Sequence, residues 1–115
     1  MGVVEQRVAS MGIEIGHVDR TGAGVLSFRR YRDMLFISGH GPFGMDGAPL
    51  MQGTVGTDLT PEQGYEAGRL TAIRMLATIK DAVGDLDNVD YFVKGLVIFN
   101  SGGKFYDKPL CKPFL

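Results

Sequence analysis

Thr60 to Gly84 is the stretch that most constrains the fold of this chain, because it carries the start, the length and the end of one helix. Thr60 is a favoured N-cap residue, Pro61 suits the first helical position, and Gln63 stands where a capping box takes Glu or Gln. Apolar residues recur at helical spacing until Gly84, a common helix terminator. We therefore predict one long amphipathic helix over residues 60–83 that packs on a sheet.

This helix is expected to present one apolar side to the sheet. Arg74 and Asp81 fall on the opposite side of a 3.6-residue wheel, so we expect both to face solvent. Small residues on the buried side would let the helix approach the strands closely. The residues predicted on the buried side are Tyr65, Gly68, Ala72, Met75, Leu76, Ile79 and Val83.

The strands of that sheet are predicted on both sides of the helix. Val25 to Tyr31 and Met34 to Ser38 are apolar-rich runs separated by two residues, which favours an antiparallel hairpin. Val89 to Phe99 is the longest β-rich run and predicts a further strand, in which Gly95 suits a bulge or a close backbone approach.

The amino-terminal residues predict a short helix. Val4, Val8 and Met11 recur at helical spacing, and Gly12 follows as a stop signal. Residues 12–24 have the mixed composition of a surface connection, with room for a brief strand at Ile13 to Ile15.

Size and composition fit one small α+β domain. The 115 residues are 44% hydrophobic and 22% charged, without a shift that would argue for two domains. A core of this size buries a modest fraction of the chain's surface, so association between copies is a natural source of added stability. The net charge of -1 argues against a strong overall field for nucleic acid or anionic membranes, and neither is an expected partner.

Cysteine usage and hydropathy favour a cytoplasmic protein. Cys111 is the single cysteine, so no internal disulfide can form and a reducing compartment fits best. No segment approaches the roughly 20 apolar residues of a membrane span. Glu5 and Arg7 interrupt the region where a signal peptide would need an apolar run.

The loop after the hairpin, Gly39 to Gly44, has the G-x-G-x-x-G spacing of a dinucleotide fingerprint. That fingerprint works only when a helix starts at the loop and points its N–H groups at the pyrophosphate. Pro42, Asp46-Gly47 and Pro49 oppose any helix before Thr60, so we expect no nucleotide cofactor. The loop reads either as a flexible turn or as a wide connection whose backbone N–H groups bind a carboxylate or carbonyl oxygen.

Other candidate chemistry is sparse. His40 beside the loop could act as an acid or base, although a surface histidine is the commoner explanation. His17 has no acidic residue at ligand spacing, so no metal site is expected. The serines lack a G-x-S-x-G elbow, which removes support for a hydrolase triad.

A small basic cluster lies on the predicted hairpin. Arg29, Arg30 and Arg32 stand beside Phe28 and Tyr31, a mixture that could contact RNA through phosphates and stacking. A solvated strand face is the more ordinary interpretation of the same residues.

Four segments occur in the order and spacing of one known family: LFISGHGP from Leu35, the Asp46-Gly47 turn, TPEQGY from Thr60, and GDLDNVDYFVKGLVIFN from Gly84. Together they resemble the RidA or YjgF-like family of reactive enamine/imine deaminases over roughly Val25 to Phe105. The longer subgroup, which begins with a helix similar to VEQRVASMGIEIG, is the most similar.

This resemblance implies a fold similar to chorismate mutase, an α+β domain whose mixed sheet has helices packed on one face. Such domains form homotrimers with clefts between subunits. The implied activity is hydrolytic deamination of a small 2-imino or enamine acid to a 2-oxo acid and ammonia, without metal or organic cofactor. The implied substrate-binding residues are Ser38, Gly39 and His40. Val25 stands where the deaminases carry a pocket tyrosine, and His40 where glutamine is common.

The family's catalytic arginine and glutamate lie on a later helix and strand, and the tail after Asn100 contains no arginine. Its cations are Lys104, Lys108 and Lys112. We therefore expect residues 1–115 to form one such domain that is incomplete at the C-terminus, with its catalytic residues unknown and little deaminase activity.

Two alternatives to a shortened deaminase remain open. One is a non-catalytic domain for small-ligand binding or assembly, and the other is an endoribonuclease-like protein that acts on RNA. Because the last helix and strand of the family are missing, Val89 to Phe99 would become an uncovered edge, and we expect self-association.

Overall fold

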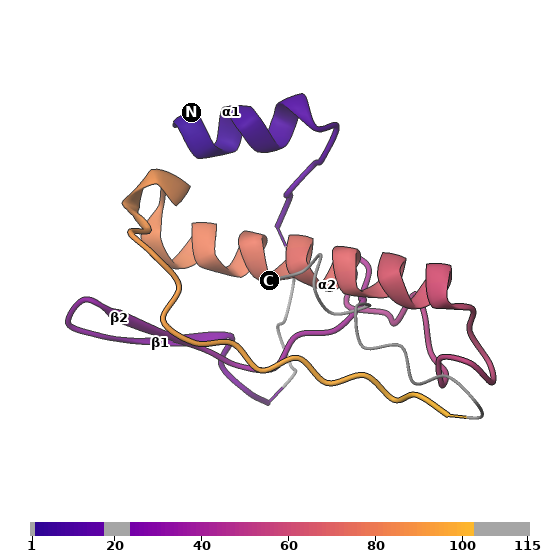
Figure 1. Cartoon of the computed structure of the whole chain (residues 1–115). Helices are drawn as coiled ribbons and strands as arrows, with labels where there is room; N and C mark the ends of the chain where they lie inside the picture. Colours follow the sequence, from indigo (N-terminus) through magenta and orange to yellow (C-terminus); the bar gives the residue numbers. More distant parts are fainter. Residues whose placement is uncertain (1, 18–23, 103–115) are drawn as a thin grey trace.

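A computed structural model describes residues 2–17 and 24–102, and the expectations for Cys111 and for the lysines of the tail lie outside these residues. The described part is an α+β arrangement of two α-helices, one 3-10 helix and one antiparallel hairpin (Figure 1). In chain order its elements are α1 (Val3–Ser10), β1 (Phe28–Tyr31), β2 (Met34–Ile37), α2 (Pro61–Val83) and η1 (Leu86–Asn88).

The long helix α2 begins and ends as the sequence predicts. The Thr60 hydroxyl accepts the N–H of Gln63 at 3.1 Å, and the Gln63 side chain accepts the N–H of Thr60 at 2.9 Å, which completes a capping box. Gly84 ends the helix at φ +83°, where its N–H donates to the carbonyl of Lys80 at 2.7 Å. A glycine suits this position because other residues rarely adopt it.

The hairpin is also confirmed, with shorter strands than predicted. Tyr31 pairs with Met34 and Phe28 with Ile37, so Arg32 and Asp33 form a two-residue turn. Such tight turns need positive φ, and Arg32 adopts φ +53° although it is not a glycine.

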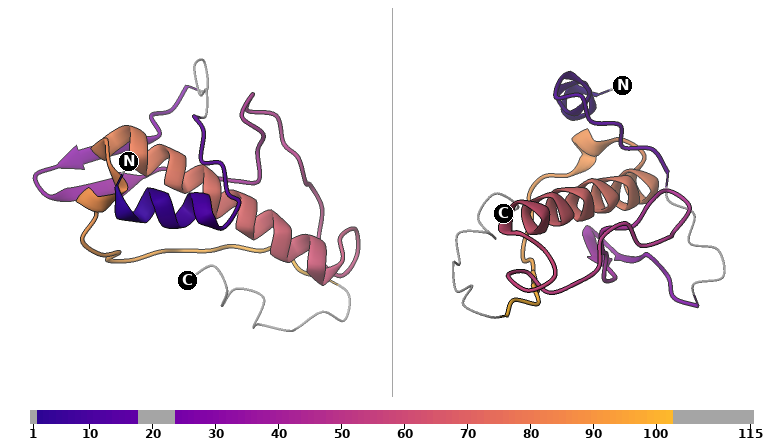
Figure 2. Two further views of the ribbon diagram at one scale, coloured as in Figure 1. Left: turned by 90° about the horizontal axis from the view of Figure 1, so that it is seen from above. Right: turned by 90° about the vertical axis from the view of Figure 1, so that its right-hand side faces the viewer.

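The core lies where α2 crosses one face of this hairpin (Figures 1 and 2). Ile15, from the segment after α1, packs there with Ala77 and Ile79 of α2 and with Leu86 of η1. Around these buried residues lie partly buried side chains from α1, β2 and α2 and from the residue after η1: Val8, Leu35, Ile37, Leu76, Val83 and Val89. α2 therefore lies between α1 on one side and the hairpin on the other.

This two-sided burial corrects the predicted orientation of α2. Arg74, expected to face solvent, is 8% exposed, whereas Tyr65 and Met75, expected to be buried, are 40% and 36% exposed. The wheel assumed a single apolar face, but the loop after β2 also covers α2 and reaches Arg74 through the carbonyl of Phe43. Ile73 and Ala77 are buried as well, although they were not among the residues predicted on the buried side.

The predicted strand at Val89 to Phe99 does not form in the described part of the chain. The segment runs in an extended path below α2 without pairing to the hairpin (Figure 1). After it, the N–H of Val55 donates to the carbonyl of Asn100 at 2.9 Å. Apolar side chains along the segment are exposed: Tyr91, Phe92, Val93, Leu96, Val97 and Ile98.

Two further sheet expectations are wrong for the same part of the chain. Ile13 to Ile15 forms no strand, although Ile15 is buried in the core. The sheet of residues 24–102 is antiparallel rather than mixed, because β1 and β2 pair only with each other. The apolar residues of Ile13 to Ile15, like those of Val89 to Phe99, are compatible with a strand, but a strand also needs the edge of another strand to pair with.

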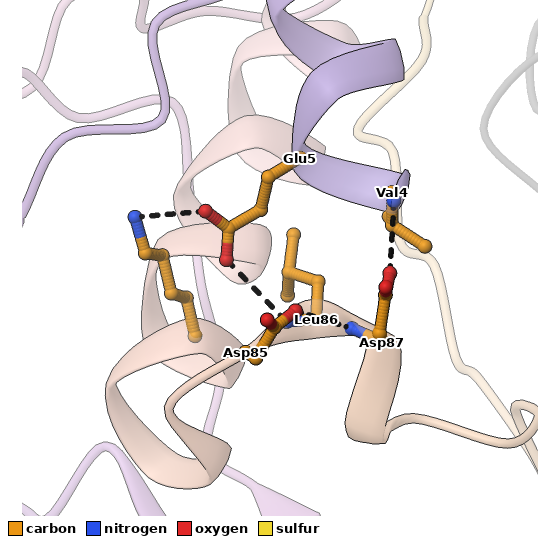
Figure 3. Close-up of polar contacts among 6 residues, drawn as sticks. Val4, Glu5, Asp85, Leu86 and Asp87 are labelled. Atoms are coloured by element: carbon orange, nitrogen blue, oxygen red, sulfur yellow. Dashed lines mark hydrogen bonds and ion pairs between the residues drawn. The ribbon is translucent and has the colours of Figure 1, made fainter. Parts of the chain in front are cut away.

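Helix α1 is joined to the end of α2 by two carboxylates (Figure 3). Asp87 accepts the N–H groups of Val3 and Val4 at 2.8 and 2.9 Å and so replaces the N-cap side chain that Gly2 lacks. Glu5 is 7% exposed, accepts the N–H of Leu86, and lies 3.3 Å from Nζ of Lys80. Residues more than 80 positions apart thus hold the first helix in place.

Within residues 2–17 and 24–102, no helix combines the length and the apolar composition needed to cross a bilayer.

Candidate functional site

The predicted site residues follow β2 directly, at the open end of the hairpin. Ser38 prolongs the pairing, because its N–H donates to the carbonyl of Ser27 at 3.0 Å. Its hydroxyl donates to the carbonyl of Leu26, which fixes the side chain across the strand end. The oxygen of that hydroxyl keeps lone pairs with which to accept a hydrogen bond from a ligand.

His40 is half-buried and joins the loop to α2. Its Nδ1 lies 2.7 Å from the carbonyl of Ser38, and its Nε2 lies 2.7 Å from Oγ1 of Thr78. A carbonyl only accepts, so Nδ1 carries a proton, and in the neutral ring Nε2 then accepts the hydroxyl proton of Thr78. The surface-histidine interpretation is therefore wrong, and the ring holds the loop on the helix.

Arg74 lies beneath the same loop, one helical turn before Thr78. Its Nε donates to the carbonyl of Phe43 at 2.8 Å, and its Nη1 is buried without a hydrogen-bond partner. No ion pair within residues 2–17 and 24–102 involves this guanidinium. The helical wheel placed Arg74 in solvent, so no local signal in the sequence pointed to this buried cation.

The loop itself contains no helix from Gly39 to Thr60, as the sequence predicts. Phe43 and Pro49 form an isolated bridge, and the N–H of Gly44 donates to the carbonyl of Ala48 at 2.8 Å. A Cβ at Gly41 would lie 2.7 Å from the Phe43 ring, so a glycine is needed where the ring folds back. The loop lacks the helix N-terminus that a dinucleotide fingerprint requires.

A shallow hollow of about 350 Å³ lies at the open end of the hairpin. Arg29 supplies its one charged group among the described lining residues, and Ser38 supplies a hydroxyl. The remaining lining is apolar: Val25, Leu26, Phe28, Phe36 and Ile37. The structure thus brings Ser38 together with Arg29, whereas His40 turns inward to Thr78 and does not line the hollow.

The basic cluster is exposed along the hairpin. Arg29 and Arg30 face solvent on β1, and the guanidinium of Arg32 stands 5.3 Å from the centre of the Tyr31 ring. Nε of Arg30 donates to the carbonyl of Arg32 at 3.2 Å, which ties its side chain to the turn.

Metal-ligating residues do not gather in the described ranges. No group of three or more His, Cys, Asp and Glu side chains comes together there. His17 instead lies 2.8 Å from a carboxylate oxygen of Asp81, at the surface of α2.

Comparison with known proteins gives distant relatives. The chain is 29% identical over 107 residues to "Protein TCP17" of Trypanosoma cruzi, an alignment that covers 93% of this chain and 66% of that protein. No family model matches the sequence.

Two solved structures share the fold. One is a "putative endoribonuclease" of Shewanella oneidensis MR-1, with a TM-score of 0.67 and 30% identity over 75% of this chain and 56% of that one. The other is the protein Atu1372 of Agrobacterium tumefaciens, of unknown function, with a TM-score of 0.62 and 29% identity over 73% of this chain and 50% of that one. The chain therefore spans between half and two thirds of the length of these relatives. It is similar to Protein TCP17 in sequence and to the two solved structures in both fold and sequence.

Proposed function

We propose that this chain is a RidA or YjgF-like domain and that the hollow beside Ser38 and Arg29 is part of a cleft for a small 2-imino or enamine acid. The order and spacing of the four family-like segments support this assignment. So does the likeness to two solved structures at 29–30% identity, which is higher than a shared fold alone would require.

The pairing of Arg29 with Ser38 in one apolar hollow carries the proposal. A guanidinium binds a carboxylate through two parallel N–H···O bonds, and the apolar lining of the hollow can contact the carbon skeleton of a small acid. The hydroxyl of Ser38 can donate to or accept from the imine end of the same molecule. Arg29 therefore supplies on the hairpin the cation that the tail of the chain was expected to lack.

The reaction of the family is a general acid/base hydrolysis. Water adds to the imine carbon, ammonia leaves, and a 2-oxo acid remains, so that no redox step and no metal are required. Among the described residues that line the hollow, none is an acid or base that could position this water. We therefore expect residues 1–115 to bind the carboxylate with little or no turnover of their own.

Binding and turnover can be measured separately. Ligand-observed NMR should detect pyruvate, a stable 2-oxo acid product, on the wild-type chain and lose it on Arg29→Gln. The matched control is Arg30→Gln, which removes a neighbouring exposed arginine that does not line the hollow.

The same samples are then given freshly generated 2-aminoacrylate, and pyruvate release is followed against buffer. Equal pyruvate binding by wild type and Arg29→Gln would refute the assigned cleft. A clear rate above buffer would show that a residue outside the hollow replaces the missing acid or base.

RNA contact is the second candidate, because Arg29, Arg30 and Arg32 are exposed beside Tyr31 on one hairpin. Phosphate contacts would come from the arginines, and a base could stack on the aromatic ring. The expected result is weak, salt-dependent binding of single-stranded RNA that falls on Tyr31→Ala and not on Tyr91→Ala, a control at an exposed tyrosine far along the chain. RNA binding that is unchanged by salt concentration and by Tyr31→Ala would exclude this candidate function.

A further inference from the structure

The guanidinium of Arg74 is buried, and no anionic group of the described residues pairs with it. Only 8% of the residue is exposed, and its Nη1 has no hydrogen-bond partner. Burying a charge without a partner costs several kcal/mol, and the structures that tolerate it supply a counter-ion. No carboxylate in the described ranges lies within ion-pair distance of this side chain.

The geometry around Arg74 limits what such an anion can be. Nε is already engaged by the carbonyl of Phe43 at 2.8 Å, so a ligand can use only the Nη end of the guanidinium. Nη1 is fully enclosed, which admits only a small group. Thr78, one helical turn further along α2, is engaged with Nε2 of His40 at 2.7 Å, so an anion at this place would bind through the guanidinium of Arg74.

We propose that Arg74 binds the carboxylate of a small monovalent acid under the Gly39 to Gly44 loop. One positive charge matches one carboxylate, and the Nη N–H donors match its two oxygens. The loop is held on α2 by the hydrogen bond between Thr78 and His40 and by the one from Arg74 to Phe43, so a ligand would reach Nη1 by displacing the loop from these contacts. The site is separate from the hollow beside Arg29 and does not depend on the proposed function.

Formate is the probe, because it is the smallest carboxylate. The thermal midpoint Tm of the full chain is measured while sodium formate replaces sodium chloride at constant ionic strength. A ligand that binds only the folded state raises Tm, and at about ten times its Kd the rise should be roughly 4–8 °C. The expected curve saturates in formate and is flat in chloride.

Two variants assign that response to Arg74. Arg74→Met removes the charge and fills a similar volume, so its Tm in chloride should equal or exceed that of the wild type and should not respond to formate. Arg69→Gln removes an exposed arginine of the same helix, paired with Glu66 at 3.4 Å, and should keep the full response. If Arg74→Met does not fold, Arg74→Lys keeps the charge but loses the planar fork, and its formate response should weaken.

Several results would overturn the proposal. A wild-type Tm that does not saturate in formate, or that rises equally in chloride, would mean that no carboxylate site exists. A response retained by Arg74→Met, or by Arg74→Lys at full strength, would place binding elsewhere. A Tm that rises with protein concentration and not with formate would mean that a second chain supplies the counter-ion.

Discussion

At the scale of single residues, the placement of α1 depends on carboxylates that act far from their own position in the chain. The first N–H groups of any helix lack partners within it, and a negative charge near them is favoured by the helix dipole. Asp87 meets both needs for α1 through Val3 and Val4. Gly2 makes room for this contact, because a Cβ there would lie 2.6 Å from Oδ2 of Asp87.

The stability that Asp87 supplies should depend on pH in a defined direction. The N–H groups of Val4 and Val3 hold the pKa of Asp87 below its ordinary value of 3.8. A carboxyl with a lowered folded-state pKa contributes fully above its unfolded pKa, and the contribution is lost as the pH falls through the lowered value. The wild type should therefore exceed Asp87→Asn in urea midpoint at neutral pH, and the gap should close below about pH 3.8.

The control for this experiment is Asp90→Asn, which changes an exposed aspartate three residues later. Its urea midpoint should follow that of the wild type across the same pH range. A gap between wild type and Asp87→Asn that persists unchanged at low pH would show that the charge of Asp87 does not hold α1.

His40 should matter more to stability than the other histidine. Removing the ring in His40→Ala leaves the hydroxyl of Thr78, a residue 5% exposed, without its partner and frees the loop from α2. The expected loss is about 1–2 kcal/mol in urea unfolding. His17→Ala removes a side chain that is 72% exposed, and should change stability by no more than about 0.5 kcal/mol. Equal losses for the two variants would contradict the role assigned to His40.

The sequence singled out His40 and Ser38 correctly as residues of interest but could not show which way each one turns. Ser38 lines the hollow, whereas His40 turns into the helix. Residues two apart share one face of a strand, but β2 ends at Ile37, so this alternation does not extend through the loop to His40. Arg74 was misplaced since a charged residue is almost never fully buried without a partner. No local sequence pattern predicts that an arginine will be buried without a partner.

At the scale of elements, prediction succeeded where the signal is local. The capping box and Gly84 fix the ends of α2, and the two-residue turn fixes the register of the hairpin. It failed at Val89 to Phe99, since strand formation needs a partner edge that the run itself does not specify. The local sequence also could not predict which sides of α2 are buried, because their burial depends on where α1 and the loop after β2 pack.

The capping box offers a direct test of this local control. Thr60→Ala removes the acceptor for the N–H of Gln63 and should cost about 1 kcal/mol of stability, within the usual range for N-cap changes. Thr57→Ala, at an exposed threonine before the helix, is the matched control and should stay near the wild-type value. If helix content and urea midpoint are unchanged in Thr60→Ala, tertiary packing alone sets the start of α2.

At the scale of the whole molecule, the apolar surface left open by the described residues is large. Leu96 and Ile98 are 82% and 77% exposed, and they belong to an extended run whose backbone pairs with neither strand of the hairpin. Monomeric proteins rarely leave such continuous apolar stretches in water. An extended apolar segment outside any sheet can also pair with another chain, and Lys94 is the one charged residue between Tyr91 and Phe99 that opposes this.

We therefore predict that the chain self-associates through this run, and that its sedimentation at low micromolar concentration shows trimers or larger species. Replacing Leu96 and Ile98 together by lysine should shift the sample toward monomer, because two added charges on a pairing strand oppose its contact with a second copy. The control places the same two charges at Val3, the first residue of α1, and at Met11, which directly follows α1; these are 74% and 64% exposed and lie outside the run. A sharp monomer boundary that does not change with concentration, combined with cooperative unfolding, would mean that the chain covers this run by itself.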